Sequence, residues 1–254
     1  MYRGQANAKW ELIPTILRDT TAPLLQSLSA HPLTTGAQVS IEFHLMRSFI
    51  HYCDAIGVSV PHDSKDFRDD NLTDLLLRRY HAKPDTWPGE ALLEAMALAR
   101  LHGCPTRLLD WSTNAYIAAY FAASEALRIR FDWKHDQRLA VLELDVGSHS
   151  AKYCGEVRVL TVSGAISPNV VAQQGLFTVH PLRSQTNEPI VSDGLEYELP
   201  KGSLRKLTVP ITASYRLYEL CERLGYNSAR LYPSADGASK AALDRLWYST
   251  PREP

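Results

Sequence analysis

Five residues that can act on a ligand lie close together in the segment HGCPTRLLDWS, residues 102–112. They are His102, Arg107, Asp110, Trp111 and Ser112. A carboxylate and a guanidinium at this spacing can form a local ion pair, so we expect Asp110 to be partly buried and bonded to Arg107 or to backbone amides. Ser112 stands where an extended run turns into a helix, and its hydroxyl can contact a ligand or cap that helix.

A further candidate, Arg3, lies in the opening segment YRGQ, where a short strand is expected. An arginine at the end of a strand offers a rigid fork of donors that matches pyrophosphate or ribose oxygens. The same fork also suits a structural ion pair, so a ligand-binding role and a structural role both stay open for Arg3.

Helices are expected to surround these residues. Apolar residues recur at helical spacing in three early segments and in the last part of the chain. The expected helices cover residues 39–55, 72–80, 89–101, 213–224 and 235–247, and a further one runs to Leu127 from a cap at Ser112, Thr113 or Asn114. The charged segment HDSKDFRDDN between the first two predicts a solvated loop.

Short runs rich in branched residues predict strands at residues 139–145, 157–162, 176–179 and 206–209. Helices therefore come first, a strand-rich part follows, and helices return at the end. This order predicts one α+β domain, with a central strand-rich core flanked by N- and C-terminal helices.

Composition excludes several classes of protein. The 27 basic and 28 acidic residues give a net charge of -1, so no overall charge favours nucleic acid or anionic lipid. No apolar stretch is long enough for a membrane span, and we expect a cytoplasmic protein. The four cysteines lack the spacing of a zinc site. The sequence also lacks GxGxxG, GxxxxGK[ST], HExxH and GxSxG motifs, which argues against Rossmann, P-loop, zincin and hydrolase chemistry.

Four motifs occur in order along the chain. They are YRGQ with a downstream W-x-L-x-P-T-x-x-R, then HGCPTRLLDWS before AYIAAYFA, then QQGLFTVHP, and finally LYPSADGASKA. Together they resemble the FRG-domain family, named for its Phe/Tyr-Arg-Gly element. The resemblance covers nearly the whole chain and implies a single FRG domain over residues 1–254.

The order of an early arginine strand, a strand leading into an aromatic-containing helix, and a late Gly-x-Phe segment resembles the NAD-binding core of ADP-ribosyltransferases. This resemblance implies an ADP-ribosyltransferase-like fold that uses NAD as a substrate. It places Arg3, Ser112 and Gln173 together at one cleft around the dinucleotide, and a tyrosine, Tyr120 or Tyr116, on the nicotinamide. A tyrosine at helical spacing is more often half-buried core, so a packing role stays open for both tyrosines.

At the position where such transferases hold a catalytic glutamate, this chain has Gln173 and Gln174. A glutamine can hydrogen-bond the ribose, but it cannot supply negative charge to an oxocarbenium-like transition state. A carboxylate from elsewhere could supply it, and the candidates are Glu42, Asp110 and Glu143. Otherwise the site binds the dinucleotide and reacts differently, or does not react.

The resemblance therefore implies an NAD-dependent ADP-ribosyltransferase-like enzyme that modifies a protein or a nucleic acid, as a bacterial toxin or antiviral defence effector. Arg3, Tyr120 and Gln173 would act in catalysis. The alternative is a non-catalytic recognition module that binds a nucleotide, a nucleic acid or a partner protein, and the glutamine in place of glutamate favours it. The sequence pattern assigns no oligomeric state.

Overall fold

The computed structural model describes residues 1–18, 33–147, 152–190 and 193–249. Its contacts divide the chain into two compact units, each assembled from separate segments. Unit 1 consists of Met1–Glu11, Asp110–Leu176 and Glu198–Pro254, and unit 2 consists of Leu12–Leu109 and Phe177–Tyr197. The expected extent of the FRG domain, residues 1–254, stays a prediction.

The fold is α+β, and the described residues form a seven-stranded sheet with strand order β4-β5-β6-β2-β1-β3-β7. Its strands are β1 (Tyr2–Gln5), β2 (Leu108–Ser112), β3 (Arg138–Leu144), β4 (Tyr153–Cys154), β5 (Val157–Leu160), β6 (Gly175–Val179) and β7 (Leu204–Pro210). Strand β1 pairs antiparallel with both β2 and β3, and β3 pairs antiparallel with β7. The structure thus confirms the predicted strands, and β4 is one that the sequence did not predict.

The YRG element of β1 lies against helix α6 (Ala115–Arg128). A Cβ atom on Gly4 would stand 2.0 Å from the carbonyl oxygen of Ala118 and 2.6 Å from the amide nitrogen of Ala122. No side chain fits there, so the glycine and the alanines together let the helix approach the strand closely. The helix that the sequence predicted up to Leu127 is thus confirmed, and it packs on β1 and β3 of the sheet.

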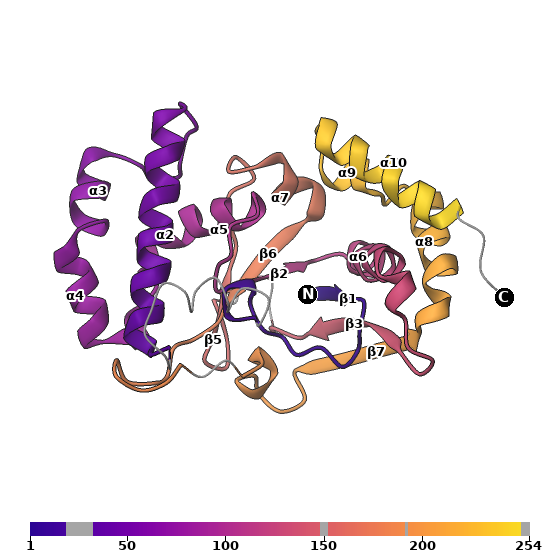
Figure 1. The fold of residues 1–254 in the computed structure, drawn as a ribbon, viewed down its shortest axis with the longest axis horizontal. Helices are drawn as coiled ribbons and strands as arrows, with labels where there is room; N and C mark the ends of the chain where they lie inside the picture. The colour runs from indigo at the N-terminus through magenta and orange to yellow at the C-terminus, as the bar shows by residue number, and fades with distance from the viewer. Residues whose placement is uncertain (19–32, 148–151, 191–192, 250–254) are drawn as a thin grey trace. The chain divides into compact units, whose positions relative to one another are not determined.

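The remaining helices of unit 1 come mostly from the C-terminal part of the chain. They are α7 (Pro168–Gln173), α8 (Ser214–Arg223), α9 (Ser228–Leu231) and α10 (Ala235–Ser249). Figure 1 shows α8, α9 and α10, coloured orange to yellow, gathered beside α6. Their shared core contains Ile117, Tyr120, Leu127, Tyr218 and Leu231, all almost fully buried.

Unit 2 is built on the long helix α2 (Thr35–Ala55), which packs against α4 (Asp74–Ala82) and α5 (Leu93–Leu101). Thr34 caps the start of α2, because its hydroxyl accepts a hydrogen bond from the amide of Ala37. Gly103 follows α5 with a φ of +93°, in the left-handed region expected of a C-terminal cap.

The prediction of a solvated loop at HDSKDFRDDN is wrong, because most of this segment forms helix α3 (Lys65–Asn71). Ser64 caps the helix by accepting a hydrogen bond from the amide of Phe67, and Phe67 is itself buried. Lys65 and Asp69 form an ion pair one turn apart. A cap and one apolar anchor are therefore enough to fold a segment whose composition is that of a loop.

Candidate functional site

Two of the predicted site residues contact each other in unit 1. The hydroxyl of Ser112, at the end of β2, donates a 2.8 Å hydrogen bond to the carbonyl oxygen of Gln173, at the end of α7. The next residues continue the contact, because the amide of Thr113 donates to the carbonyl oxygen of Gln174 at 3.0 Å. Gln174 has a φ of +47°, so the chain turns sharply where α7 leads into β6.

Arg3 extends this cluster from β1, in which Tyr2 stands opposite Ser112. Its Nη1 atom donates a 2.7 Å hydrogen bond to the carbonyl oxygen of Asp110 and lies 3.8 Å from the Asp110 carboxylate. The structure thus connects Arg3 to β2 through Asp110, and Ser112 of β2 to the backbone of Gln173, although the three residues come from three separate motifs. We call Arg3, Asp110, Ser112 and Gln173 the β2 cluster.

Asp110 is partly buried, as predicted, but Arg107, one of its two expected partners, is not bonded to it. Asp110 pairs with Arg3, and its side chain is 37% exposed. Arg107 is completely buried and forms a bidentate ion pair with Glu42, with Nε and Nη2 at 2.7 and 2.6 Å from the two carboxylate oxygens. Residues three apart in an extended chain point to opposite sides, which explains why the two side chains find different partners.

Glu42 stands at the centre of a closed network in unit 2. Besides Arg107, it accepts hydrogen bonds from the indole of Trp87 at 2.8 Å and from the side-chain amide of Gln38 at 2.7 Å. The third guanidinium nitrogen of Arg107 donates to the carbonyl oxygen of His180 at 2.9 Å. We call these residues the Glu42 network. A buried ion pair with this many partners stabilises a core and leaves no group for a substrate.

The other candidate carboxylates can now be compared. Glu42 is excluded by its burial and its four bonds to side chains. Glu143 accepts from the hydroxyl of Tyr2 at 3.2 Å and pairs with Arg205 at 3.2 Å. Asp110 is the candidate that lies in the β2 cluster, beside Arg3.

The side chain of Gln173 has a defined orientation. Its Nε2 atom donates a 3.1 Å hydrogen bond to the carbonyl oxygen of Leu231, at the end of α9. With the amide nitrogen turned toward Leu231, the oxygen Oε1 is the atom that faces away from α9. In this orientation the glutamine presents an acceptor oxygen, as a glutamate would, but without the negative charge.

The two candidate tyrosines of α6 differ sharply in exposure. Tyr120 has no exposed surface, and its hydroxyl donates to Asp244 at 2.6 Å and lies 2.7 Å from the Ser228 hydroxyl. Burial, and next the hydrogen bond to Asp244, raise the pKa of Tyr120. A ring enclosed on all sides has no face for nicotinamide, so the structure favours a packing role for Tyr120. Tyr116, by contrast, is 55% exposed.

The sequence left three candidates for the N-terminal cap of α6, namely Ser112, Thr113 and Asn114. Asn114 takes this role, because its Oδ1 atom accepts a 2.9 Å hydrogen bond from the amide of Tyr116. The Ser112 hydroxyl instead accepts from the amide of Asn114 while it donates to Gln173. Ser112 thus fastens the turn before the helix rather than the helix itself.

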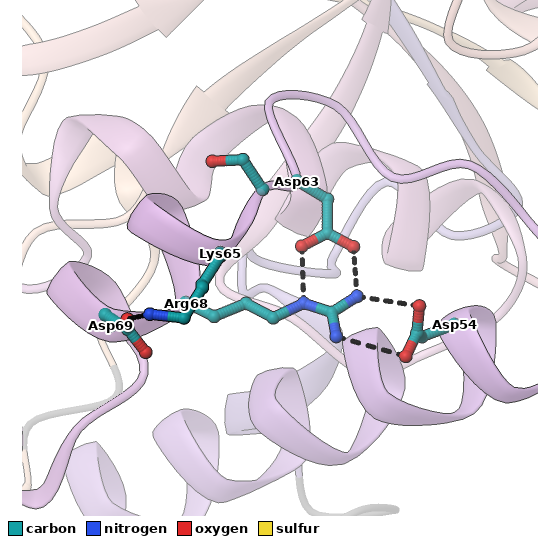
Figure 2. A pocket seen from close by; sticks show the side chains of 6 residues that line it. Asp54, Asp63, Lys65, Arg68 and Asp69 are labelled. Atoms are coloured by element: carbon teal, nitrogen blue, oxygen red, sulfur yellow. Dashed lines mark hydrogen bonds and ion pairs between the residues drawn. The ribbon is translucent and has the colours of Figure 1, made fainter.

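A pocket of about 360 Å³ lies in unit 2, and none of the predicted site residues is among those that line it (Figure 2). Asp54, Asp63, Lys65, Arg68 and Asp69 line it, and Arg68 binds Asp63 through two bonds of 2.7 and 2.6 Å. The Arg68 guanidinium also lowers the pKa of the Asp54 carboxyl. Each of the three aspartates in this pocket is paired with Arg68 or Lys65. Within the described ranges no group of three His, Cys, Asp or Glu could hold a metal.

Comparison with known proteins gives one match. A family model described as FRG domain matches residues 1–129, which contain β1, all of the segment HGCPTRLLDWS and helix α6. Neither the curated proteins nor the solved structures give a match. Across the residues that the structure describes, no helix is long and apolar enough to cross a membrane.

Proposed function

From the premise that this chain belongs to the FRG domain family, we propose that it is an ADP-ribosyltransferase-like enzyme that takes NAD as a substrate. The observation that carries the proposal is the β2 cluster. Residues from three distant motifs meet there, with a 2.8 Å hydrogen bond between Ser112 and Gln173.

In this proposal the β2 cluster binds the dinucleotide. Arg3 supplies the positive charge for the pyrophosphate, since a guanidinium binds phosphate oxygens through two parallel bonds. Its present bond to the Asp110 carbonyl holds the group at the end of β1 and β2. Gln173 presents its Oε1 atom as an acceptor for a ribose hydroxyl, with Leu231 fixing the amide.

The reaction breaks the bond between the nicotinamide nitrogen and the ribose. Nicotinamide leaves with the electron pair of that bond, and an acceptor nucleophile then bonds the same ribose carbon and releases a proton. The positive charge that develops on the ribose needs a negative partner. Asp110 is the carboxylate in the cluster that can supply it and can also take up the proton.

A second candidate function is a recognition module without catalysis. The specific observation in its favour is that polar groups of the cluster already have partners within unit 1. The Ser112 hydroxyl is bonded to Gln173 and Asn114, and the Gln173 amide nitrogen is bonded to Leu231. The role in toxicity or antiviral defence, the cytoplasmic location and the protein or nucleic-acid acceptor are proposals that follow from the resemblance.

Incubation with NAD labelled on the adenylate tests the enzyme proposal. Wild-type protein should release nicotinamide and place label on itself, on a protein or on a nucleic acid. Arg3→Ala should lower nicotinamide release at least about tenfold, because a lost charge-assisted contact is worth roughly 1.5–3 kcal/mol. Arg216→Ala is the matched control, since Arg216 is an exposed arginine on α8 of the same unit.

Gln173→Glu separates the two roles of the glutamine. A carboxylate cannot donate to the Leu231 carbonyl and would be repelled by it, so we expect nicotinamide release to fall. Increased release would mean that the missing charge, not the acceptor orientation, limits the reaction. Wild-type protein that releases no nicotinamide, yet binds nucleotides or a partner tightly, would contradict the enzyme proposal and support the recognition module.

A further inference from the structure

Three side chains form a stacked column at the start of helix α6, in unit 1. The rings of Tyr116 and Tyr226 lie nearly parallel, with an angle of 15° between their planes and 5.6 Å between their centres. On Tyr226, the Arg230 guanidinium carbon lies 5.1 Å from the ring centre. We call Tyr116, Tyr226 and Arg230 the tyrosine column. Contacts between cations and rings, and between offset rings, are both favourable.

Hydrogen bonds hold the column in place. Asn114 donates from Nδ2 to the hydroxyl of Tyr226 at 3.1 Å, while its Oδ1 atom caps the helix at the Tyr116 amide. Asn227 caps α9 by accepting from the amide of Arg230 at 3.0 Å. One asparagine therefore ties the two tyrosines to the same helix end. A surface that is ordered beforehand loses less entropy when it binds a ligand.

The outer end of the column is open to solvent. Tyr226 covers one face of Tyr116, yet Tyr116 remains 55% exposed. The exposed surface must then come from the opposite ring face and the ring edge. An aromatic ring that is fixed in position and exposed on one face offers a place for another planar ring.

We propose that the outer face of Tyr116 stacks on a base of a single-stranded nucleic acid. Proteins bind single strands by stacking successive bases on aromatic side chains, with arginine adding cation–π contacts, and the column combines both features. A duplex would not fit, because its bases are already stacked on one another. This inference rests on the proposed function, because it names nucleic acid as the class of acceptor that the transferase modifies.

The surroundings of the column favour a strand over a free nucleotide. A second ring with a cation lies beyond α9, where the ammonium nitrogen of Lys240 is 4.1 Å from the ring centre of Tyr232. Residues 226–240 therefore carry two pairs of a ring and a cation. The ring of the first pair precedes α9 in the sequence, and the ring of the second follows it. Arg230 and Lys240 add two positive charges close to the column in sequence, and the several phosphates of a strand gain more from them than a single nucleotide does.

The test is fluorescence anisotropy of a labelled twelve-base thymidine oligonucleotide, titrated with full-length protein in the absence of NAD. We expect saturable binding that Tyr116→Ala weakens about fivefold or more, which is the lower end of what stacking of one base on an aromatic ring contributes. Tyr116→Phe should bind within about twofold of the wild type, because stacking needs the ring but not the hydroxyl. Tyr153→Ala is the matched control, because Tyr153 is 57% exposed in the same unit.

Three results would overturn the proposal: no binding by the wild type at low salt, equal binding by Tyr116→Ala, or equally tight binding of a thymidine mononucleotide. A thermal melt of each variant checks that the substitution leaves the fold intact. Because no NAD is present, failure of this experiment leaves the proposed transferase reaction untouched. Loss of nicotinamide release with oligonucleotide binding retained would instead refute the transferase and leave a nucleic-acid-binding module.

Discussion

The Glu42 network and the β2 cluster take residues from the same short segment and use them in opposite ways. In unit 2, Arg107 has no exposed surface and binds Glu42 through bonds of 2.6 and 2.7 Å. In unit 1, Asp110 is partly exposed and lies 3.8 Å from Arg3. Both regions contain an arginine and a carboxylate, but only the first has closed, short and fully buried contacts.

This difference teaches that residue type and spacing alone do not separate a structural ion pair from a functional one. A desolvated pair needs internal partners for its charged groups, and Trp87 and Gln38 donate to the Glu42 carboxylate besides Arg107. A pair that remains in contact with water can exchange a partner for a ligand at little cost. The comparison predicts large stability effects in the first region and small ones in the second.

The largest effect is expected for Glu42→Ala. Removing this carboxylate leaves the Arg107 charge buried without a partner, which should lower the free energy of unfolding by about 3–5 kcal/mol. Urea denaturation followed by circular dichroism measures it. Asp74→Ala is the control, because Asp74 forms an exposed pair with Arg47 in the same unit. A loss no larger than that of the control would mean that the two regions do not differ as proposed.

The next effect is a loss of stability at alkaline pH that originates in the core of unit 1. Burial raises the pKa of the Cys221 thiol to about 11, from an ordinary value of 9.0. A raised pKa stabilises the protein below pH 9, and this contribution is lost as the pH rises through about 11. The expected change is roughly 2 kcal/mol for one such group.

Unfolding free energies measured from pH 8 to 11 test this expectation. Cys221→Ala should give a flatter decline across that range than the wild type, whatever its stability at pH 8. Parallel curves for the two proteins would show that the thiol is not responsible. The raised pKa values of Tyr120 and Tyr218 act in the same direction, so some decline should remain in the variant.

Much of the fold could be predicted from the sequence, because its elements carry strong local signals. Runs of branched residues predicted β3 and β7, and apolar residues at helical spacing predicted α5. Helix α3 was missed, since its charged composition concealed one buried anchor, Phe67. The candidate site was predicted only as a set of residues. Which arginine meets which carboxylate depends on side-chain direction and burial, and neither can be read from spacing.

Tyr120, the buried tyrosine of α6, tests the link between burial and structural role within unit 1. Tyr120→Phe removes one hydroxyl and leaves Asp244 with fewer donors, although Arg128 still binds that carboxylate at 2.9 Å. We expect the free energy of unfolding to fall by about 1–2 kcal/mol. Tyr116→Phe, at the exposed end of the same helix, should change stability by less than about 0.5 kcal/mol. Equal effects of the two substitutions would break the link between burial and structural role.

A small stability effect is also expected for Asp110→Ala, in the β2 cluster. Its carboxylate is 37% exposed and lies 3.8 Å from Arg3, so solvent screens the pair and its loss should cost at most about 1 kcal/mol. The backbone carbonyl that anchors Arg3 remains in the variant, and the guanidinium should keep its place. If Asp110 supplies charge to the reaction, nicotinamide release should nevertheless fall at least about tenfold. Thermal melts and the NAD assay, run on one preparation, measure both quantities. A melting temperature lowered as strongly as in Glu42→Ala would make Asp110 a structural residue. The exposed pair of Asp110 and Arg3 would then stabilise the fold as much as the buried pair of Glu42 and Arg107, and the contrast between the two regions would disappear.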